Sequence, residues 1–396
     1  MLECVSRSLR RRIPHVLRGV RLPRAAYDGE PIADAPDQAV IAPGGVDADA
    51  QLPIEPSAES GRDADRPPWQ RYAVAALPIV GVAAAYYLTA RLGLLQELVR
   101  DQVTPYWPPT GVALVALLVL GIRIWPGIAL GAFILNATIG SSLVAAALIT
   151  FGNTLAVICA YLLLRRADFR AAMDRRRDAL ALVFLGALAP MLLSATIGSA
   201  ALLLTDSIPM ADFWPTWSVW WTGDAMGVLV VTPFLLVVLT HLRIPRGILW
   251  HRWVEAALLF TSTLLVAVLS IASSYELLFL VFPFLIWAAL RFQMVGAAPC
   301  ALIVSTVAII SAANEAGPFA RHDLFANMTT LQAFNGTTAL TALLLAAIIA
   351  ERNSAHEQVE RAVSQLTGLL GQLDRGRTII ELQVPSQSLL EPDDKR

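Results

Sequence analysis

One acidic residue lies inside an apolar stretch that is long enough to cross a lipid bilayer. Asp224 belongs to the motif WWTGDAMG (220–227), about eleven residues into a hydrophobic segment that begins at Phe213. A charged side chain at that depth costs about 3 kcal/mol or more unless it is protonated, paired or facing a polar cavity. Its small neighbours allow another helix to pack closely against it. Asp224 is therefore the first candidate for a functional residue.

Other polar side chains also lie in hydrophobic segments, namely Thr222, Asn136, Asn153, Gln332 and Asn335. One interpretation is a polar ligand-sensing pocket in the outer half of a helical bundle, with Asp224 as its charged member. The other is interhelical hydrogen bonding, worth about 0.6 kcal/mol for each contact. For the amides the second interpretation is favoured two to one. For Asp224 function is favoured, because a lone acid is a poor structural contact between membrane helices.

Two charged residues lie at segment ends that are expected to face the cytoplasm. Arg291 ends the motif WAALR (287–291), and Glu351 follows the last apolar segment. A pair between them would couple the bundle to the outgoing helix. Alternatively, each side chain reaches the headgroups independently. The sequence leaves these two interpretations open.

Composition and motifs exclude most soluble enzyme classes. The chain is 56% hydrophobic and 15% charged, which is typical of a protein surrounded by lipid. There is no GxxxxGK, HExxH or GxSxG motif and no dinucleotide-binding glycine run. The cysteines, Cys4, Cys159 and Cys300, are far apart and have no histidine at ligand spacing. We expect no catalytic residues, no metal, no cofactor and no nucleic-acid partner.

The apolar residues predict an all-α, polytopic transmembrane bundle of about 8–10 membrane helices. The segments are 72–93, 107–121, 124–139, 142–164, 179–204, 213–240, 253–273, 276–291, 295–313 and 328–350. The second and third are short for a full span and form either a re-entrant hairpin or two thin spans. In both cases they count as a pair, so the parity of the topology is unchanged.

Arginine distribution predicts the orientation. The loops at 165–177 and 241–252 are the most basic, and short turns hold Arg123 and Arg291. Alternation puts all of them on one side, so the positive-inside rule predicts a multi-pass plasma-membrane protein with both termini cytoplasmic. Five tryptophans are expected in an aromatic belt at the outer face, mostly as interface anchors: Trp107, Trp214, Trp217, Trp220 and Trp221.

Three regions of the chain lie outside the predicted membrane spans, namely 1–71, 353–376 and 377–396. Residues 1–71 are basic and then Pro-rich, which predicts a disordered region without a secretory signal. That region is either an unstructured leader, which we favour, or a contact to anionic lipid. Residues 353–376 carry a heptad seam at Val359, Val363, Leu366, Leu370 and Leu373, which favours a parallel coiled coil in a homodimer. Packing of this helix on its own bundle is the alternative. Residues 377–396 are expected to be a flexible tail.

Several motifs occur in an order that resembles the first MASE family of integral membrane sensor domains. They include WPPTGVAL (107–114), GIRIWPG (121–127), GAF (131–133), GNTL (152–155), SATIG (194–198), WWTGDAMG (220–227) and WAALRF (287–292). They extend through 72–352. The resemblance implies a bacterial inner-membrane sensor whose cytoplasmic output is usually a kinase, cyclase, phosphodiesterase or PAS module. The chain departs from that pattern after the coiled segment, so a separate signalling partner is expected to supply the output.

The combined expectation is a non-enzymatic membrane sensor that passes a ligand- or partner-dependent change to the cytoplasm. One alternative is a transporter or substrate-capture subunit, which broken helices and an inverted repeat would favour. A membrane scaffold that uses both tails is the other alternative. Uptake into proteoliposomes separates the transporter from the sensor, and a pull-down without the tails tests the scaffold.

Overall fold

Every regular element in the described part of the chain is a helix. The computed structural model describes residues 68–94, 106–139, 142–241, 250–273, 277–314, 316–317 and 324–383. Nearly all of the 1–71 region that was predicted to be disordered lies outside these ranges. The same holds for most of the basic loop at 241–252 and for the last thirteen residues of the predicted tail. Within these ranges, seven helical stretches are long and apolar enough to cross a membrane, with Leu278–Ala312 counted as one.

The first four helices pack through close backbone contacts. They are α4 (Pro68–Leu94), α5 (Pro108–Leu120), α6 (Trp125–Thr138) and α7 (Leu143–Arg166), with the 3₁₀ turn η1 (Ile122–Ile124) before α6. A Cβ on Gly127 or Gly131 of α6 would collide with the carbonyl of Ile79 or Ala83 on α4. Glycine therefore sets the distance between these two helices. With 13 and 14 residues, α5 and α6 reach only about 20 Å, as their short sequences predicted.

Two continuous helices contain π-helical segments. The first, which we call the α8–α9 rod, joins α8 (Arg176–Ala181), η2 (Leu182–Leu188) and α9 (Ala189–Leu204). The second joins α10 (Phe213–Met226), η4 (Gly227–Val231) and α11 (Thr232–His241), preceded by η3 (Met210–Asp212). Each π segment ends two residues before a proline, Pro190 or Pro233. Because proline has no N–H and its ring collides with the carbonyl four residues earlier, the helix widens there instead of breaking.

The remaining helices are α12 (Trp250–Ala272), η5 (Leu278–Val281), α13 (Phe282–Ala313) and α14 (Leu324–Gln383). Inside α13, Gln293 has φ 51° and ψ −137°, which is not helical. A Cβ on Gly296 would lie 3.0 Å from the carbonyl oxygen of Ala288. In a straight helix, positions 288 and 296 are separated by about 12 Å. The chain therefore folds back at Gln293, and the two predicted segments 276–291 and 295–313 are two antiparallel helices.

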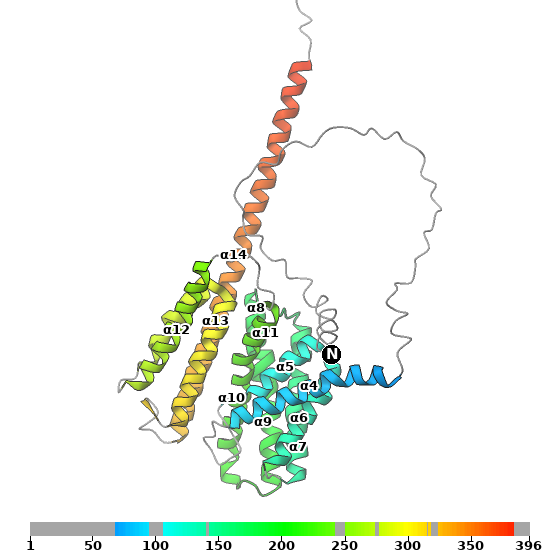
Figure 1. The fold of residues 1–396 in the computed structure, drawn as a ribbon, viewed down its shortest axis with the longest axis vertical. Coiled ribbons are helices and arrows are strands. Elements are labelled where there is room, and N and C mark those ends of the chain that lie inside the picture. Colours follow the sequence, from blue (N-terminus) through cyan, green and yellow to red (C-terminus); the bar gives the residue numbers. More distant parts are fainter. Residues whose placement is uncertain are drawn as a thin grey trace, which may run out of the picture.

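Helix α14 begins inside the bundle and then projects far beyond it (Figure 1). Its first part packs along α13, α10 and η4. Residues 352–370 are exposed throughout, and beyond its first turns beside the α8–α9 rod this part projects away from the described bundle (Figure 1), which argues against packing of the coiled segment on its own bundle. The helix ends at Gln383, seven residues beyond the predicted end of the coil.

Candidate functional site

Asp224 is buried where α10 meets α5 and the α8–α9 rod, with only 2% of its surface exposed. Its Oδ1 accepts a hydrogen bond from Thr110 Oγ1 on α5, at 2.6 Å. Its Oδ2 lies 2.6 Å from Ser194 Oγ on α9. Hydrogen bonds of this length to an ionised oxygen belong to the strong class. The acid therefore joins three helices that are distant in sequence.

The polar contacts continue from Ser194 to α7 and α4. Ser194 Oγ also lies 2.8 Å from Asn153 Oδ1, and Asn153 Nδ2 lies 3.4 Å from the Tyr86 hydroxyl. A serine hydroxyl has one hydrogen and cannot donate to Asp224 and Asn153 together. A half-turn of the Asn153 amide resolves this, because Nδ2 then donates to Ser194 while Tyr86 donates to Oδ1. The chain of four polar residues can therefore hold its hydrogens in two alternative directions, toward Asp224 when the acid is ionised and away from it only when Asp224 carries the proton.

Glycines bring the N-terminus of α5 against the helix that carries Asp224. The backbone N–H of Trp107 donates to the carbonyl of Gly223 at 3.1 Å. A Cβ on Gly227 would collide with the Trp107 carbonyl, and one on Gly111 would collide with Gly227. The positive end of the α5 dipole thus approaches the carboxylate, which favours a negative charge there. These glycines are needed for close approach rather than for an unusual φ.

Three side chains along one stripe of α10 bind the α8–α9 rod. Trp217 Nε1 donates to Thr196 Oγ1 at 3.0 Å, and Trp221 Nε1 donates to the Leu188 carbonyl at 2.8 Å. Asp224 adds the contact to Ser194 described above. Leu188 ends the π-helical η2. Trp217 and Trp221 therefore join helices in addition to any role at the membrane interface, whereas Trp214 is exposed as a belt residue would be.

Two of the predicted sensing residues lie outside this cluster. The hydroxyl of Thr222 donates to the Ser218 carbonyl of its own helix, at 2.8 Å. The Asn136 amide donates to the Ala132 carbonyl of its own helix, also at 2.8 Å. Helical geometry offers a carbonyl four residues earlier, and these side chains use it. For both residues, the structure does not support membership of a pocket around Asp224.

Asn335 is fully buried on the part of α14 that lies inside the bundle. Within the described residues, neither its Oδ1 nor its Nδ2 has a hydrogen-bond partner, and the same is true of Thr338 Oγ1. Gln332, one turn earlier, is partly buried. Buried polar atoms without partners destabilise the packing around them. The inner part of α14 is therefore held less firmly than an apolar interface of this size would be.

The pair between Arg291 and Glu351, one of the two interpretations that the sequence left open, is not formed in the structure. Arg291 Nε donates to Glu255 Oε1 at 2.6 Å, because the fold-back at Gln293 brings the end of this segment beside the start of α12. Glu351 instead accepts from Arg176, at 3.0 Å from Nε and 3.2 Å from Nη2. The outgoing helix is therefore tied to the first residue of the α8–α9 rod.

Sequence reasoning missed four members of these contacts, namely Tyr86, Thr110, Ser194 and Arg176. Thr110 and Ser194 lie inside two of the motifs noted above, WPPTGVAL and SATIG, next to small residues. A search for hydroxyls in those motifs would have found them. Tyr86 and Arg176 have no comparable signal in the sequence. The described residues contain no group of three or more His, Cys, Asp or Glu that could hold a metal ion.

Comparison with known proteins agrees with these features. The profile of the family described as MASE1 matches residues 79–353. A similar protein is the probable diguanylate cyclase DgcE of Escherichia coli (strain K12), 28% identical over 253 residues. That alignment covers 61% of this chain and 22% of the DgcE chain. No solved structure matches the chain at a significant level.

Proposed function

The chain belongs to the MASE1 family of membrane-associated sensor domains, and on this premise we propose how it senses and signals. The stimulus alters the hydrogen-bond cluster around Asp224, and the change reaches the cytoplasm through α14. The chain itself carries out no chemical reaction in this proposal. The activity named for DgcE is not transferred, because the alignment covers 22% of that protein.

The membrane orientation follows from the arginines. Arg176 and Glu351 meet at one end of the bundle, and Arg291 meets Glu255 at the start of α12. These are the ends that the positive-inside rule assigns to the cytoplasm. The proposed protein lies in the bacterial inner membrane with both termini in the cytoplasm, and α14 projects into the cytosol.

One observation carries the proposal, namely that the α8–α9 rod contacts both the Asp224 cluster and α14. We call this connection the route. Ser194 of the rod contacts Asp224, and Arg176 at its start contacts Glu351 of α14. These two residues of the rod are separated by about 27 Å along its axis. A shift or rotation of the rod that changes the Ser194 contact therefore also moves the anchor of α14.

Signalling requires two bundle states with different affinity for the stimulus. Three features favour such states here. The hydrogens between Tyr86 and Asp224 have two possible directions, depending on whether the acid carries a proton. The two helices that carry Ser194 and Asp224 contain π segments, an irregularity that is frequent at functional sites. Asn335, which is buried and has no hydrogen-bond partner among the described residues, lowers the cost of moving α14.

The output end of α14 offers a surface for a second copy of the chain. Val359, Val363, Leu366 and Leu370 are between 56% and 66% exposed and recur at heptad spacing. In the proposed homodimer these residues form a short parallel coiled coil. A signalling partner that reads the coil then supplies the enzymatic output.

The test follows the position of α14 directly and needs no knowledge of the stimulus. Spin labels at Arg166 and Ser364, both exposed, report the distance between the bundle and α14 in the full chain. Ser194→Ala and Arg176→Gln should each change this distance distribution. Ser218→Ala is the matched control, because that hydroxyl bonds to its own helix. A distribution that Ser194→Ala leaves unchanged contradicts the proposed route.

A further inference from the structure

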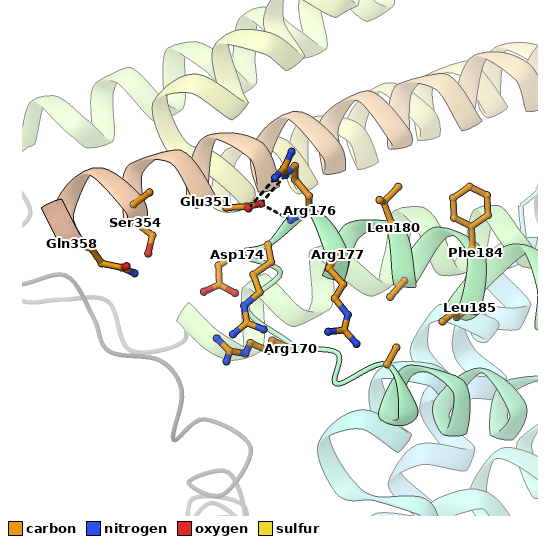
Figure 2. A pocket seen from close by; sticks show the side chains of 14 residues that line it. Arg170, Asp174, Arg176, Arg177, Leu180, Phe184, Leu185, Glu351, Ser354 and Gln358 are labelled. Atoms are coloured by element: carbon orange, nitrogen blue, oxygen red, sulfur yellow. Dashed lines mark hydrogen bonds and ion pairs between the residues drawn. The ribbon is translucent and has the colours of Figure 1, made fainter.

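A cavity of about 970 Å³ lies where α14 leaves the bundle. One wall is formed by the loop before α8 and by the first turns of the α8–α9 rod. The other wall is the part of α14 that follows Glu351, with Ser354 and Gln358 facing the space (Figure 2). The Arg176–Glu351 pair bridges the two walls. A ligand that fills this cavity would lie between the rod and the outgoing helix.

The cavity carries an excess of positive charge. Four arginines line it, at 170, 175, 176 and 177, against two acids, Asp174 and Glu351. Only Arg176 of the four forms a salt bridge within the described part of the chain. Guanidinium groups bind phosphate oxygens in a two-pronged geometry, so clusters of them are typical of phosphate recognition. Three arginines here remain available for an anion.

An apolar strip adjoins the arginines on the same rod. Leu180 and Phe184 also line the cavity, and they are 42% and 55% exposed. They lie one helical turn apart, in the direction that leads from the basic loop into the apolar part of the rod (Figure 2). A soluble phosphate would leave this strip bare. A phospholipid would cover it with an acyl chain while its phosphate faces the arginines.

We propose that this cavity binds a phosphate-bearing anion, specifically the headgroup of an anionic phospholipid in the leaflet that borders the basic loop. Arg170 and Arg177 bind the phosphate, and Leu180 with Phe184 packs along the acyl chain. The bound lipid lies beside the Arg176–Glu351 pair, in the space between the rod and α14. Its binding does not depend on the proposed role of Asp224, although its effect on signalling rests on the proposed route through α14.

Native mass spectrometry of the full chain in detergent tests the binding. The protein is titrated with phosphatidylglycerol, with phosphatidylcholine or with inorganic phosphate. Each arginine near an anionic lipid contributes about fivefold in affinity, so Arg170→Gln with Arg177→Gln should weaken phosphatidylglycerol binding about 30-fold. The control variant, Arg123→Gln with Arg252→Gln, removes two exposed arginines outside the cavity and should bind as the wild type does.

The three titrants and the two variants together distinguish a lipid site from a site for a soluble anion and from no site. Tight phosphatidylglycerol binding that is lost only in the cavity variant, with little binding of phosphatidylcholine, supports the proposal. Binding of inorganic phosphate without binding of phosphatidylglycerol overturns the lipid assignment and makes the ligand a soluble anion. Equal phosphatidylglycerol binding by both variants and the wild type overturns the site itself. Because lipid binding is measured directly, none of these results depends on whether Asp224 senses anything.

Discussion

Substitutions of Asp224 test whether this acid stabilises the contact between helices or is only tolerated at its buried position. Asparagine preserves the contacts, because its amide Nδ2 can donate to Ser194 Oγ while its oxygen accepts from Thr110. Ser194 then donates its single hydrogen to Asn153. We therefore expect Asp224→Asn to fold with at least the stability of the wild type. The stimulus-dependent change in the position of α14 should nevertheless be lost, because the amide carries no charge and cannot titrate.

Leucine at the same position removes both acceptors. Two hydrogen bonds to an ionised group stabilise by about 1.5–3 kcal/mol each. Burying the acid within the membrane costs about 3 kcal/mol, which leucine recovers. The middle of these ranges predicts that Asp224→Leu lowers the free energy of unfolding by about 1.5 kcal/mol. The hydroxyls of Thr110 and Ser194 then lose their charged acceptor.

Thermal unfolding in detergent measures this difference. A thiol-reactive dye reports unfolding through Cys300, which is fully buried in the folded protein. The experiment uses a Cys4→Ser, Cys159→Ser background so that neither of these residues contributes. The spin-label distance between Arg166 and Ser364 is measured on the same preparations.

Asp206→Asn is the matched control, since this acid is exposed and asparagine tolerates its positive φ of 53°. It should change neither the unfolding temperature nor the α14 distance. An Asp224→Leu variant that is as stable as the wild type and keeps the wild-type distance distribution would refute the reasoning. Asp224 would then be a tolerated residue and not part of the functional site.

Three further predictions concern other parts of the chain. Cysteine at Arg170 should resist a membrane-impermeant thiol reagent in intact cells while cysteine at Ser207 reacts; the reverse pattern contradicts the orientation. Leu366→Lys with Leu370→Lys should abolish crosslinking between copies through α14 and leave the unfolding temperature unchanged; undiminished crosslinking would exclude this seam as the dimer contact. Asn335→Leu should raise stability by about 1 kcal/mol, since its buried amide has no hydrogen-bond partner among the described residues, and should narrow the α14 distance distribution; a less stable variant would indicate a hidden partner.

Much of the fold was predictable because lipid imposes simple requirements on sequence. A span needs a long apolar run, so segments such as 142–164 and 253–273 were located within a few residues of α7 and α12. The fold-back at Gln293 was also predicted as a turn, because Arg291 interrupts two apolar runs. The continuous α8–α9 rod starts three residues before its predicted segment, since charged residues can begin a helix outside the apolar run.

The candidate site was predicted only in part. Asp224 and Asn153 were identified because polar groups are conspicuous among apolar residues. Their partners Thr110 and Ser194 were missed, because a hydroxyl in a membrane helix usually bonds to its own backbone, as Thr222 does. Which hydroxyl faces across to another helix depends on how the helices are rotated.

The sequence by itself determined the class of the protein, its helical segments and the presence of a buried acid, because hydropathy and charge act locally along the chain. Only the tertiary structure decided the pairing of Glu351 with Arg176 in place of Arg291. Many acids and bases at one membrane face satisfy the same electrostatic rule. Which acid pairs with which base depends on which helix ends lie within about 4 Å of each other. The packing of glycines, tryptophans and proline-widened turns throughout the bundle fixes those distances.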